Sequence, residues 1–144
     1  MVMTMRPSPV RQFPTIRELM TPSPHTISAD QKLAAAHELM QRHGIRHLPV
    51  LAASRIIGLV SERDILLVES LPRTDPTTTT VEDAMVEDVF TVPPDAPVGE
   101  VIETMIDRKL GSAIVCDGDH VAGVFTTVDA LRALHRMLEG SARD

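Results

Sequence analysis

The hydrophobic positions in the first half of the chain change their spacing several times. A short extended segment ends at Ile27, and apolar residues from Leu33 to Met40 then recur at helical spacing. Gly44 follows, and glycine suits the left-handed backbone at a helix end. Two apolar runs of strand length come next, and Ser61 opens a further helix. The predicted order is strand, helix, strand, strand, helix, at 25–27, 28–43, 46–51, 56–60 and from 61 onward.

Ser28 and Gln31 stand three residues apart immediately before the first helical stretch. This spacing is typical of a capping box, in which the serine hydroxyl and the glutamine side chain satisfy open amides. We therefore expect the first long helix to begin at this pair.

The second half of the chain repeats the first at an offset of 65 residues. The alignment needs no gap, and conservative pairs such as Ile27 with Val92 and Ser61 with Thr126 fill the spaces between identities. The identical pairs include Met20 and Met85, Thr26 and Thr91, Asp30 and Asp95, Glu38 and Glu103, Met40 and Met105, Val50 and Val115, Gly58 and Gly123, Asp64 and Asp129, and Leu66 and Leu131. Because one register holds through apolar and turn positions alike, the chain contains two copies of one unit. The second copy is expected to have strands at 90–92, 112–116 and 121–125 and helices at 95–108 and 127–138.

Prolines and a run of threonines, between residues 72 and 80, separate the two copies. The predicted divisions are an N-terminal tail at 1–14, a first repeat at 15–71, a linker at 72–79, a second repeat at 80–139 and a C-terminal tail at 140–144. One unit of roughly 55–60 residues buries too little surface to be stable alone. The sequence therefore predicts an α+β fold in which two copies face each other and share one core.

Composition narrows the class of partner. Hydrophobic residues make up 43% of the chain and charged residues 24%, as in globular proteins, and the formal net charge of −6 disfavours a nucleic-acid partner. Tryptophan and tyrosine are absent and phenylalanine occurs only at Phe13, Phe90 and Phe125, so a bound purine must lie against aliphatic side chains and backbone amides. No apolar run is long enough to cross a membrane, and residues 1–13 do not resemble a signal peptide, so a cytoplasmic protein is expected.

Residues that often carry catalysis or metals show no recognised spacing here. We expect the histidines to be solvated or capping residues and Cys116 to be a small buried residue on a strand. The histidines are His25, His37, His43, His47, His120 and His135. No nucleophile–base arrangement and no phosphate loop of the Walker type occurs, so the sequence predicts no catalytic residues, no metal site and no enzyme.

One short motif occurs in both copies, at 58–64 and 123–129: a glycine, two apolar residues, a hydroxyl, two variable residues and an aspartate. A hydroxyl followed three residues later by an acid is a helix N-cap and requires no ligand. The same groups can also hold a nucleotide, because the hydroxyl and the open amides suit a phosphate and the aspartate can accept both ribose hydroxyls. A glycine just upstream would permit close approach of the backbone to that ligand.

The repeated unit resembles the CBS (cystathionine-β-synthase) domain family. The resemblance spans residues 15–139 and is carried by Leu-Met-Thr-Pro at 19–22, Arg-His-Leu-Pro-Val at 46–50 and Gly-Leu-Val-Ser-Glu-Arg-Asp at 58–64. It implies two repeats packed through their sheets with pseudo-two-fold symmetry, and a homodimer of such pairs. It also implies adenosine ligands (AMP, ADP, ATP, S-adenosyl methionine or NAD) in two clefts between the repeats, with no required cofactor.

The resemblance assigns residues to each cleft. One cleft combines Thr26, Ile27, Ile45, Arg46 and His47 of the first repeat with Thr126, Thr127 and Asp129 of the second. The other combines Ser61, Arg63 and Asp64 with Thr91, Val92, Leu110, Gly111 and Ser112. The second repeat departs from the pattern where Lys109 replaces Gly44 and Ile114 replaces Pro49. Which cleft is occupied stays open.

Three functions fit these observations. The first is a sensor that binds an adenosine nucleotide and signals to a separate, unidentified effector protein. The alternative is a dimerisation or protein-interaction module with empty clefts, and the third is a metal- or nucleic-acid-binding regulator. The apolar stripe of Leu131, Leu134 and Leu138 and the cluster at 65–68 are expected to meet a second subunit, or else to be covered within the monomer.

Overall fold

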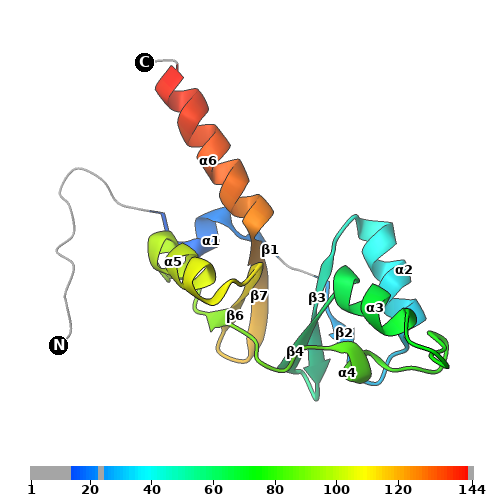
Figure 1. Cartoon of the computed structure of the whole chain (residues 1–144). Coiled ribbons are helices and arrows are strands. Elements are labelled where there is room, and N and C mark those ends of the chain that lie inside the picture. Colours follow the sequence, from blue (N-terminus) through cyan, green and yellow to red (C-terminus); the bar gives the residue numbers. More distant parts are fainter. Residues whose placement is uncertain (1–13, 23–24, 143–144) are drawn as a thin grey trace.

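Each half of the chain folds in the order that the repeat predicts (Figure 1). The computed structural model describes residues 14–22 and 25–142. The first half contains β2 (Ile27–Ser28), α2 (Leu33–His43), β3 (His47–Ala52), β4 (Arg55–Ser61) and α3 (Glu62–Glu69). The second contains β5 (Thr91–Val92), α5 (Val98–Arg108), β6 (Ser112–Asp117), β7 (His120–Thr126) and α6 (Thr127–Ala142). Before each half lies a short segment: α1 (Ile16–Leu19) and β1 (Thr21–Pro22) before the first, α4 (Val81–Ala84) before the second.

The two sheets have matching registers. In the first sheet, of order β2-β3-β4, Gly58 pairs with Val50, and in the second, of order β1-β7-β6-β5, Gly123 pairs with Val115. Both sheets shift register immediately after these pairs. The α+β fold and the duplication are therefore confirmed down to individual strand pairs.

A small apolar cluster joins the two sheets. Ile114 and Val124 of the second sheet are buried, and Leu51, Ile56 and Leu59 of the first sheet pack against them. Larger cores lie between each sheet and its helices, so the chain has a helix–sheet–sheet–helix arrangement.

The short segment that precedes each half packs on the other half. Ile16 of α1 is fully buried in the second core, and Thr21 of β1 pairs with Val124 of β7. Conversely, Val81 of α4 is fully buried in the first core, and Val86 bridges Leu59 of β4. The units that pack together are therefore not the units that repeat in sequence, and neither repeat has a complete core without the other.

The predicted capping box at Ser28 and Gln31 is wrong. Lys32 is the N-cap of α2, and no side chain caps that helix. Its open amides are satisfied instead from the linker, because Leu33 N–H donates to the Thr79 carbonyl and Ala34 N–H donates to the Pro76 carbonyl. The second long helix likewise begins at 98 rather than at the expected 95, and the N–H of its first residue donates to the Pro14 carbonyl.

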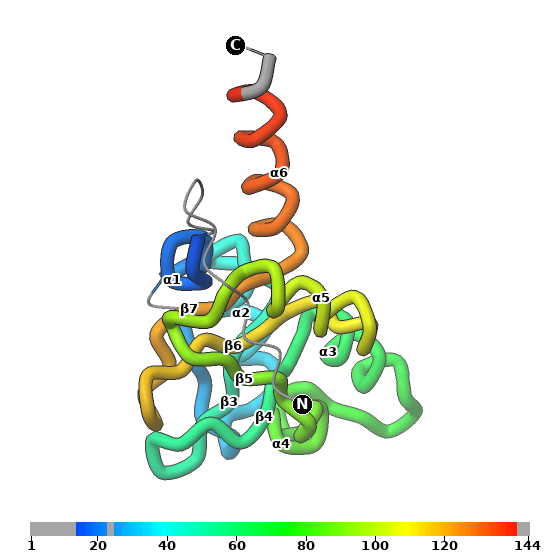
Figure 2. The backbone as a smooth tube through the Cα atoms, turned by 90° about the vertical axis from the view of Figure 1, so that its left-hand side faces the viewer, coloured from blue at the N-terminus to red at the C-terminus, as the bar shows by residue number. Residues whose placement is uncertain are grey.

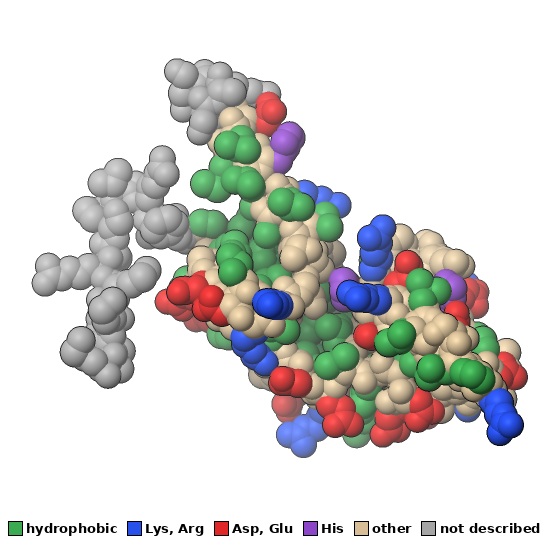
Figure 3. Space-filling model, viewed as in Figure 1, with side chains coloured by type: hydrophobic (Ala, Val, Ile, Leu, Met, Phe, Trp, Pro, Cys, Tyr) green, Lys and Arg blue, Asp and Glu red, His purple; other side chains and the backbone are tan. Residues whose placement is uncertain are grey.

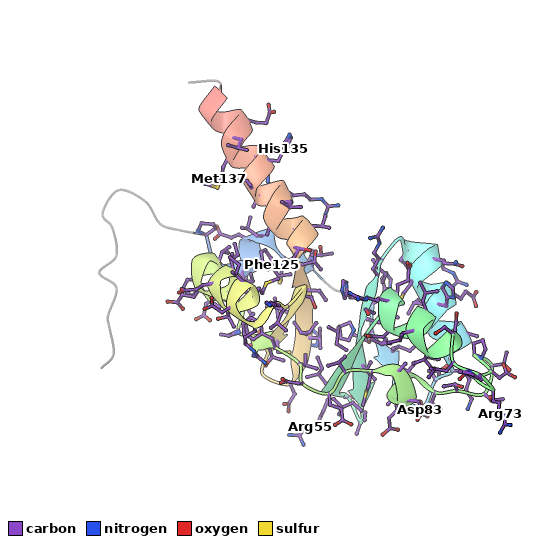
Figure 4. The ribbon with its side chains drawn as sticks, in the orientation of Figure 1. Arg55, Arg73, Asp83, Phe125, His135 and Met137 are labelled. Carbon is purple, nitrogen blue, oxygen red and sulfur yellow. The ribbon has the colours of Figure 1, made fainter. Side chains whose placement is uncertain are left out.

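Helix α6 projects away from the rest of the protein (Figures 1 and 2). Its apolar side chains gather along one side in the space-filling view (Figure 3), and Met137 extends outward from the helix (Figure 4). Leu131 is 63% exposed and Leu134 is 49% exposed, so this chain alone does not cover the stripe. In the neighbouring cluster, Ile65 is buried in the first core whereas Leu66 and Leu67 are exposed.

Across the part of the chain that the structure describes, we find no helix that combines the length and the apolar character needed to span a bilayer.

Candidate ligand-binding site

Both copies of the repeated motif form the reciprocal hydrogen bonds of a capping box. Ser61 N–H donates to Asp64 Oδ2 at 3.0 Å, and Asp64 N–H donates back to Ser61 Oγ at 3.0 Å. In the second half, Thr126 N–H donates to Asp129 Oδ2 at 2.9 Å and Asp129 N–H donates to Thr126 Oγ1 at 3.3 Å. In each half, the aspartate therefore uses only Oδ2 to cap the helix, and Oδ1 takes no part in the cap.

The two glycines of the motif lie close to methionine side chains. A Cβ on Gly58 would lie 2.5 Å from Met85 Sδ, and a Cβ on Gly123 would lie 2.5 Å from Met20 Sδ. The atoms that approach belong to the segments exchanged between the halves, which include residues 20–21 beside Gly123 and residues 85–86 beside Gly58. Close approach by a ligand stays a prediction.

A cleft of about 320 Å³ opens beside Asp64 between the two halves. Ser61 and Asp64 line it from the first half, and Leu110, Gly111 and Ser112 line it from the second. These five residues are among those that the resemblance assigned to one cleft. Its size falls at the lower end of the range of small-molecule sites.

The remaining residues assigned to that cleft lie elsewhere. Arg63 is exposed on α3 and Thr91 is exposed on β5, whereas Val92 is buried in the second core. His47, which was assigned to the other cleft, lines this one. Because β3 pairs His47 with Ser61, the imidazole lies beside the motif of its own repeat.

The environment of His47 favours the neutral imidazole. Burial lowers the pKa of His47, and the neighbouring Arg46 lowers it further. The carboxylate of Asp64 opposes this effect but does not reverse it. The ring can therefore accept a proton when an anion enters the cleft.

Serine, histidine and aspartate side chains thus line one cleft, yet they do not form a catalytic relay. Within residues 14–22 and 25–142, no hydrogen bond joins His47 to Ser61 or to Asp64. The Ser61 hydroxyl accepts from the backbone of its own helix, and a nucleophile would need a base within hydrogen-bond reach.

The residues assigned from the sequence do not include seven that line this cleft: Val86, Asp88, Val89, Phe90, Lys109, Leu59 and Ile114. The first four follow α4, the segment that packs on the opposite half. For Lys109, the sequence did carry a signal, because a lysine stands there in place of the Gly44 of the first repeat. Lys109 retains the left-handed backbone of that glycine, with φ of +55°.

The surroundings of Asp129 differ from those of Asp64. Asp129 is 5% exposed, Thr21 Oγ1 donates to its Oδ1 at 3.1 Å, and Arg132 Nη1 lies 3.6 Å from the same oxygen. Thr126 Oγ1 also donates to Asp129 Oδ2, at 3.2 Å, as part of the helix cap.

The first-repeat residues assigned to the Asp129 cleft are placed as follows. Ile27 is buried in the first core, and Ile45 packs against that core. Thr26 is half-buried and Arg46 is exposed. Thr127 is exposed at the start of α6, where its N–H donates to the Gly111 carbonyl.

His25, His43 and Cys116 are of residue types that can bind metals. The rings of His25 and His43 stack with centroids 3.6 Å apart. Desolvation lowers the pKa of the His43 imidazole, and the neighbouring His25 lowers it further. Cys116 is only partly buried, contrary to expectation, and burial together with Asp119 raises the pKa of its thiol. No group of three metal-ligating side chains occurs among the residues described.

Comparison with known proteins gives a consistent result. A family model described as the CBS domain matches residues 16–78 and 81–136. Inosine-5'-monophosphate dehydrogenase of Thermoplasma acidophilum is 29% identical over 108 residues, which are 74% of this chain but 21% of the enzyme. The chain thus spans about a fifth of the length of that relative.

Two solved structures match nearly the whole fold. A candidate acetoin utilization protein (AcuB) from Vibrio cholerae has a TM-score of 0.80 and 28% identity, covering 92% of this chain and 98% of that one. The CBS domain pair of protein MJ0100, solved in complex with 5'-methylthioadenosine and S-adenosyl-L-methionine, has a TM-score of 0.79 and 22% identity. That match covers 88% of this chain and 99% of the other.

Proposed function

The chain belongs to the CBS domain family, and we propose that it is a regulatory module that binds an adenosine-containing ligand in the cleft beside Asp64. The observation that carries the proposal is the Asp64 carboxylate, which lines a cleft of about 320 Å³ and uses only Oδ2 in its helix cap. The CBS pair of MJ0100 binds two adenosine compounds, which supports the same ligand class here.

Each part of such a ligand has a suitable partner in the cleft. Asp64 Oδ1 would accept ribose hydroxyls, in charge-assisted hydrogen bonds. The base would lie against Val86, Val89 and Ile114, because this cleft offers aliphatic surface and one phenyl ring, that of Phe90. No catalytic step is needed for this role.

A phosphate would meet groups at the other side of the carboxylate. The hydroxyl of Ser61 accepts from Asp64 N–H, so its own hydrogen is free to donate to an anion. Lys109 supplies a cation, and His47 can gain a proton in response to negative charge. These groups favour a nucleotide such as AMP, ADP or ATP over an uncharged nucleoside.

The signal would pass to a separate protein through a homodimer. The exposed apolar side chains of α6 and α3 fit an interface between copies of this chain, since monomers rarely leave such a stripe uncovered. The same face favours the second candidate function, an interaction module with empty clefts. Ligand binding distinguishes the two.

Calorimetric titration of AMP, ATP, S-adenosyl methionine and adenosine into the wild-type chain and Asp64→Ala tests the proposal. We expect micromolar to low-millimolar binding of at least one compound, and a roughly 10- to 100-fold loss in Asp64→Ala. Thermal melting verifies that the variant folds. If none of the four compounds binds wild type at millimolar concentration, the interaction module replaces the sensor.

A further inference from the structure

Asp129 and Asp64 occupy equivalent positions, but their second carboxylate oxygens have different neighbours. Asp129 Oδ1 accepts a hydrogen bond from Thr21 Oγ1 at 3.1 Å, and Arg132 Nη1 lies 3.6 Å away. Across residues 14–22 and 25–142, no hydrogen bond or ion pair reaches Asp64 Oδ1. The protein therefore satisfies one carboxylate itself and leaves the other open.

One substitution between the repeats explains the hydrogen bond. β1 places Thr21 opposite Val124, and the equivalent bridge in the first half places Val86 opposite Leu59. Val86 therefore stands where Thr21 stands in the other half. Valine and threonine have the same shape, and only threonine carries a hydroxyl that can donate to the neighbouring aspartate.

A second difference between the repeats explains why a cation lies beside Asp129 but not beside Asp64. Arg132 lies one turn after Asp129 on α6, and the residue at the equivalent position on α3 is Leu67. The guanidinium balances the buried Asp129 carboxylate, whereas α3 offers no cation at that position.

The two carboxylates also differ in how accessible they are to a ligand, and Asp64 is the more accessible. Asp129 is 5% exposed, whereas Asp64 is half-buried and lines the open cleft. A ribose at Asp129 would have to compete with the Thr21 hydroxyl and the Arg132 guanidinium for Oδ1, which offsets much of the new hydrogen bond. A ribose at Asp64 displaces no side chain.

We infer that the two clefts are not equivalent: the chain takes one adenosine ligand, beside Asp64, and Thr21 excludes a second by occupying the Asp129 carboxylate. This stoichiometry of one ligand per chain rests on the proposed function, and Thr21 is the residue that sets it. Exchange of Thr21 and Val86 between the halves should exchange the properties of the clefts.

Calorimetry with adenosine tests this, because adenosine lacks the phosphate and reports on ribose and base alone. Wild type should bind one adenosine per chain. Thr21→Val should gain a second site, and Val86→Thr should weaken the original site about tenfold, as its new hydroxyl competes for Asp64 Oδ1. Thr21→Ser keeps the hydroxyl and should bind like wild type. It also serves as the control if Thr21→Val folds poorly.

The possible failures are distinguishable. Two sites in wild type, a single site in Thr21→Val, or binding lost in Asp129→Ala but kept in Asp64→Ala would each overturn the inference while the proposed function stands. If neither adenosine nor AMP, ATP or S-adenosyl methionine binds wild type, both fail together.

Discussion

Lys109 occupies in the second half the position that Gly44 occupies in the first, and both residues have left-handed backbone, with φ of +55° and +62°. Each ends a long helix, α5 or α2, as the C-cap. Gly44 adopts this conformation without cost, whereas a lysine does so under strain of the order of 1 kcal/mol or more. The strained residue is the one that lines the Asp64 cleft.

Lys109→Gly should therefore raise stability and lower nucleotide affinity together. Relief of strain, less the greater chain entropy of glycine, should increase the free energy of unfolding by about 0.5–1 kcal/mol. Affinity for AMP should fall about three- to fivefold at low salt, since an exposed ion pair is lost, while affinity for adenosine stays unchanged. Thermal melting and calorimetry measure the two effects.

Gly44→Lys is the matched control, because it introduces the same strain away from the Asp64 cleft. It should destabilise the fold without altering affinity for AMP. Equal losses for AMP and adenosine in Lys109→Gly would show that Lys109 does not contact a phosphate.

Gly58 and Gly123 should tolerate no side chain. Added Cβ atoms would lie 2.5 Å from a methionine sulfur in both cases, and 3.0 Å or 2.7 Å respectively from a backbone carbonyl oxygen. Since a carbonyl yields less than a flexible methionine, Gly123→Ala should cost more than Gly58→Ala, within about 1–3 kcal/mol. Urea denaturation measures both.

Gly99→Ala is the control for these glycines. Gly99 lies in the first turn of α5 with no atom near an added Cβ, so alanine should stabilise the helix by up to about 1 kcal/mol. Equal effects at 58, 99 and 123 would show that the exchanged segments do not approach the sheets this closely.

Leu134→Glu should convert a homodimer into a monomer. Leu134 is 49% exposed on α6, and a charge there would oppose burial against a second copy. Sedimentation at tens of micromolar should show a dimer for wild type and a monomer for the variant. Arg136→Glu, on the opposite side of the helix, should remain dimeric. A wild-type chain that sediments as a monomer would contradict this interface.

The sequence predicted what local spacing controls. The order of elements and the junctions at Ser61 and Thr126 follow from periods of two and 3.6 residues, and the duplication follows from the 65-residue offset. The start of α2 did not follow, because its amides bond to carbonyls of Thr79 and Pro76, more than forty residues away. A local capping motif at 28–31 cannot reveal that competition.

Only part of the candidate site was predictable from the sequence. Residues of the repeated motif and residues 110–112 line one cleft, and their role in binding a ligand stays a prediction. Val86 was missed because the segment that includes α4 packs on the other half, where Val86 bridges Leu59 of β4. Repeat alignment shows which positions are equivalent, but not which repeat supplies the neighbour.

His47 should make both stability and nucleotide binding depend on pH near neutrality. Burial lowers its pKa below 6.5 in the folded chain, so the unfolded chain binds more protons as pH falls through that range. Stability should therefore decrease as pH falls from 7.5 to 5.5, and His47→Gln should lose less over that interval. The exposed His120→Gln should behave like wild type, and the comparison is made by thermal melting at each pH.

A bound phosphate reverses the preference of this ring. Because negative charge beside His47 favours the imidazolium, AMP binding should take up protons, and affinity for AMP relative to adenosine should rise as pH falls from 7.5 to 6. Calorimetry in two buffers of different ionisation enthalpy measures the proton uptake. His47→Gln should abolish most of it. The same uptake in wild type and His47→Gln would assign the proton to another group and remove His47 from the phosphate side of the cleft.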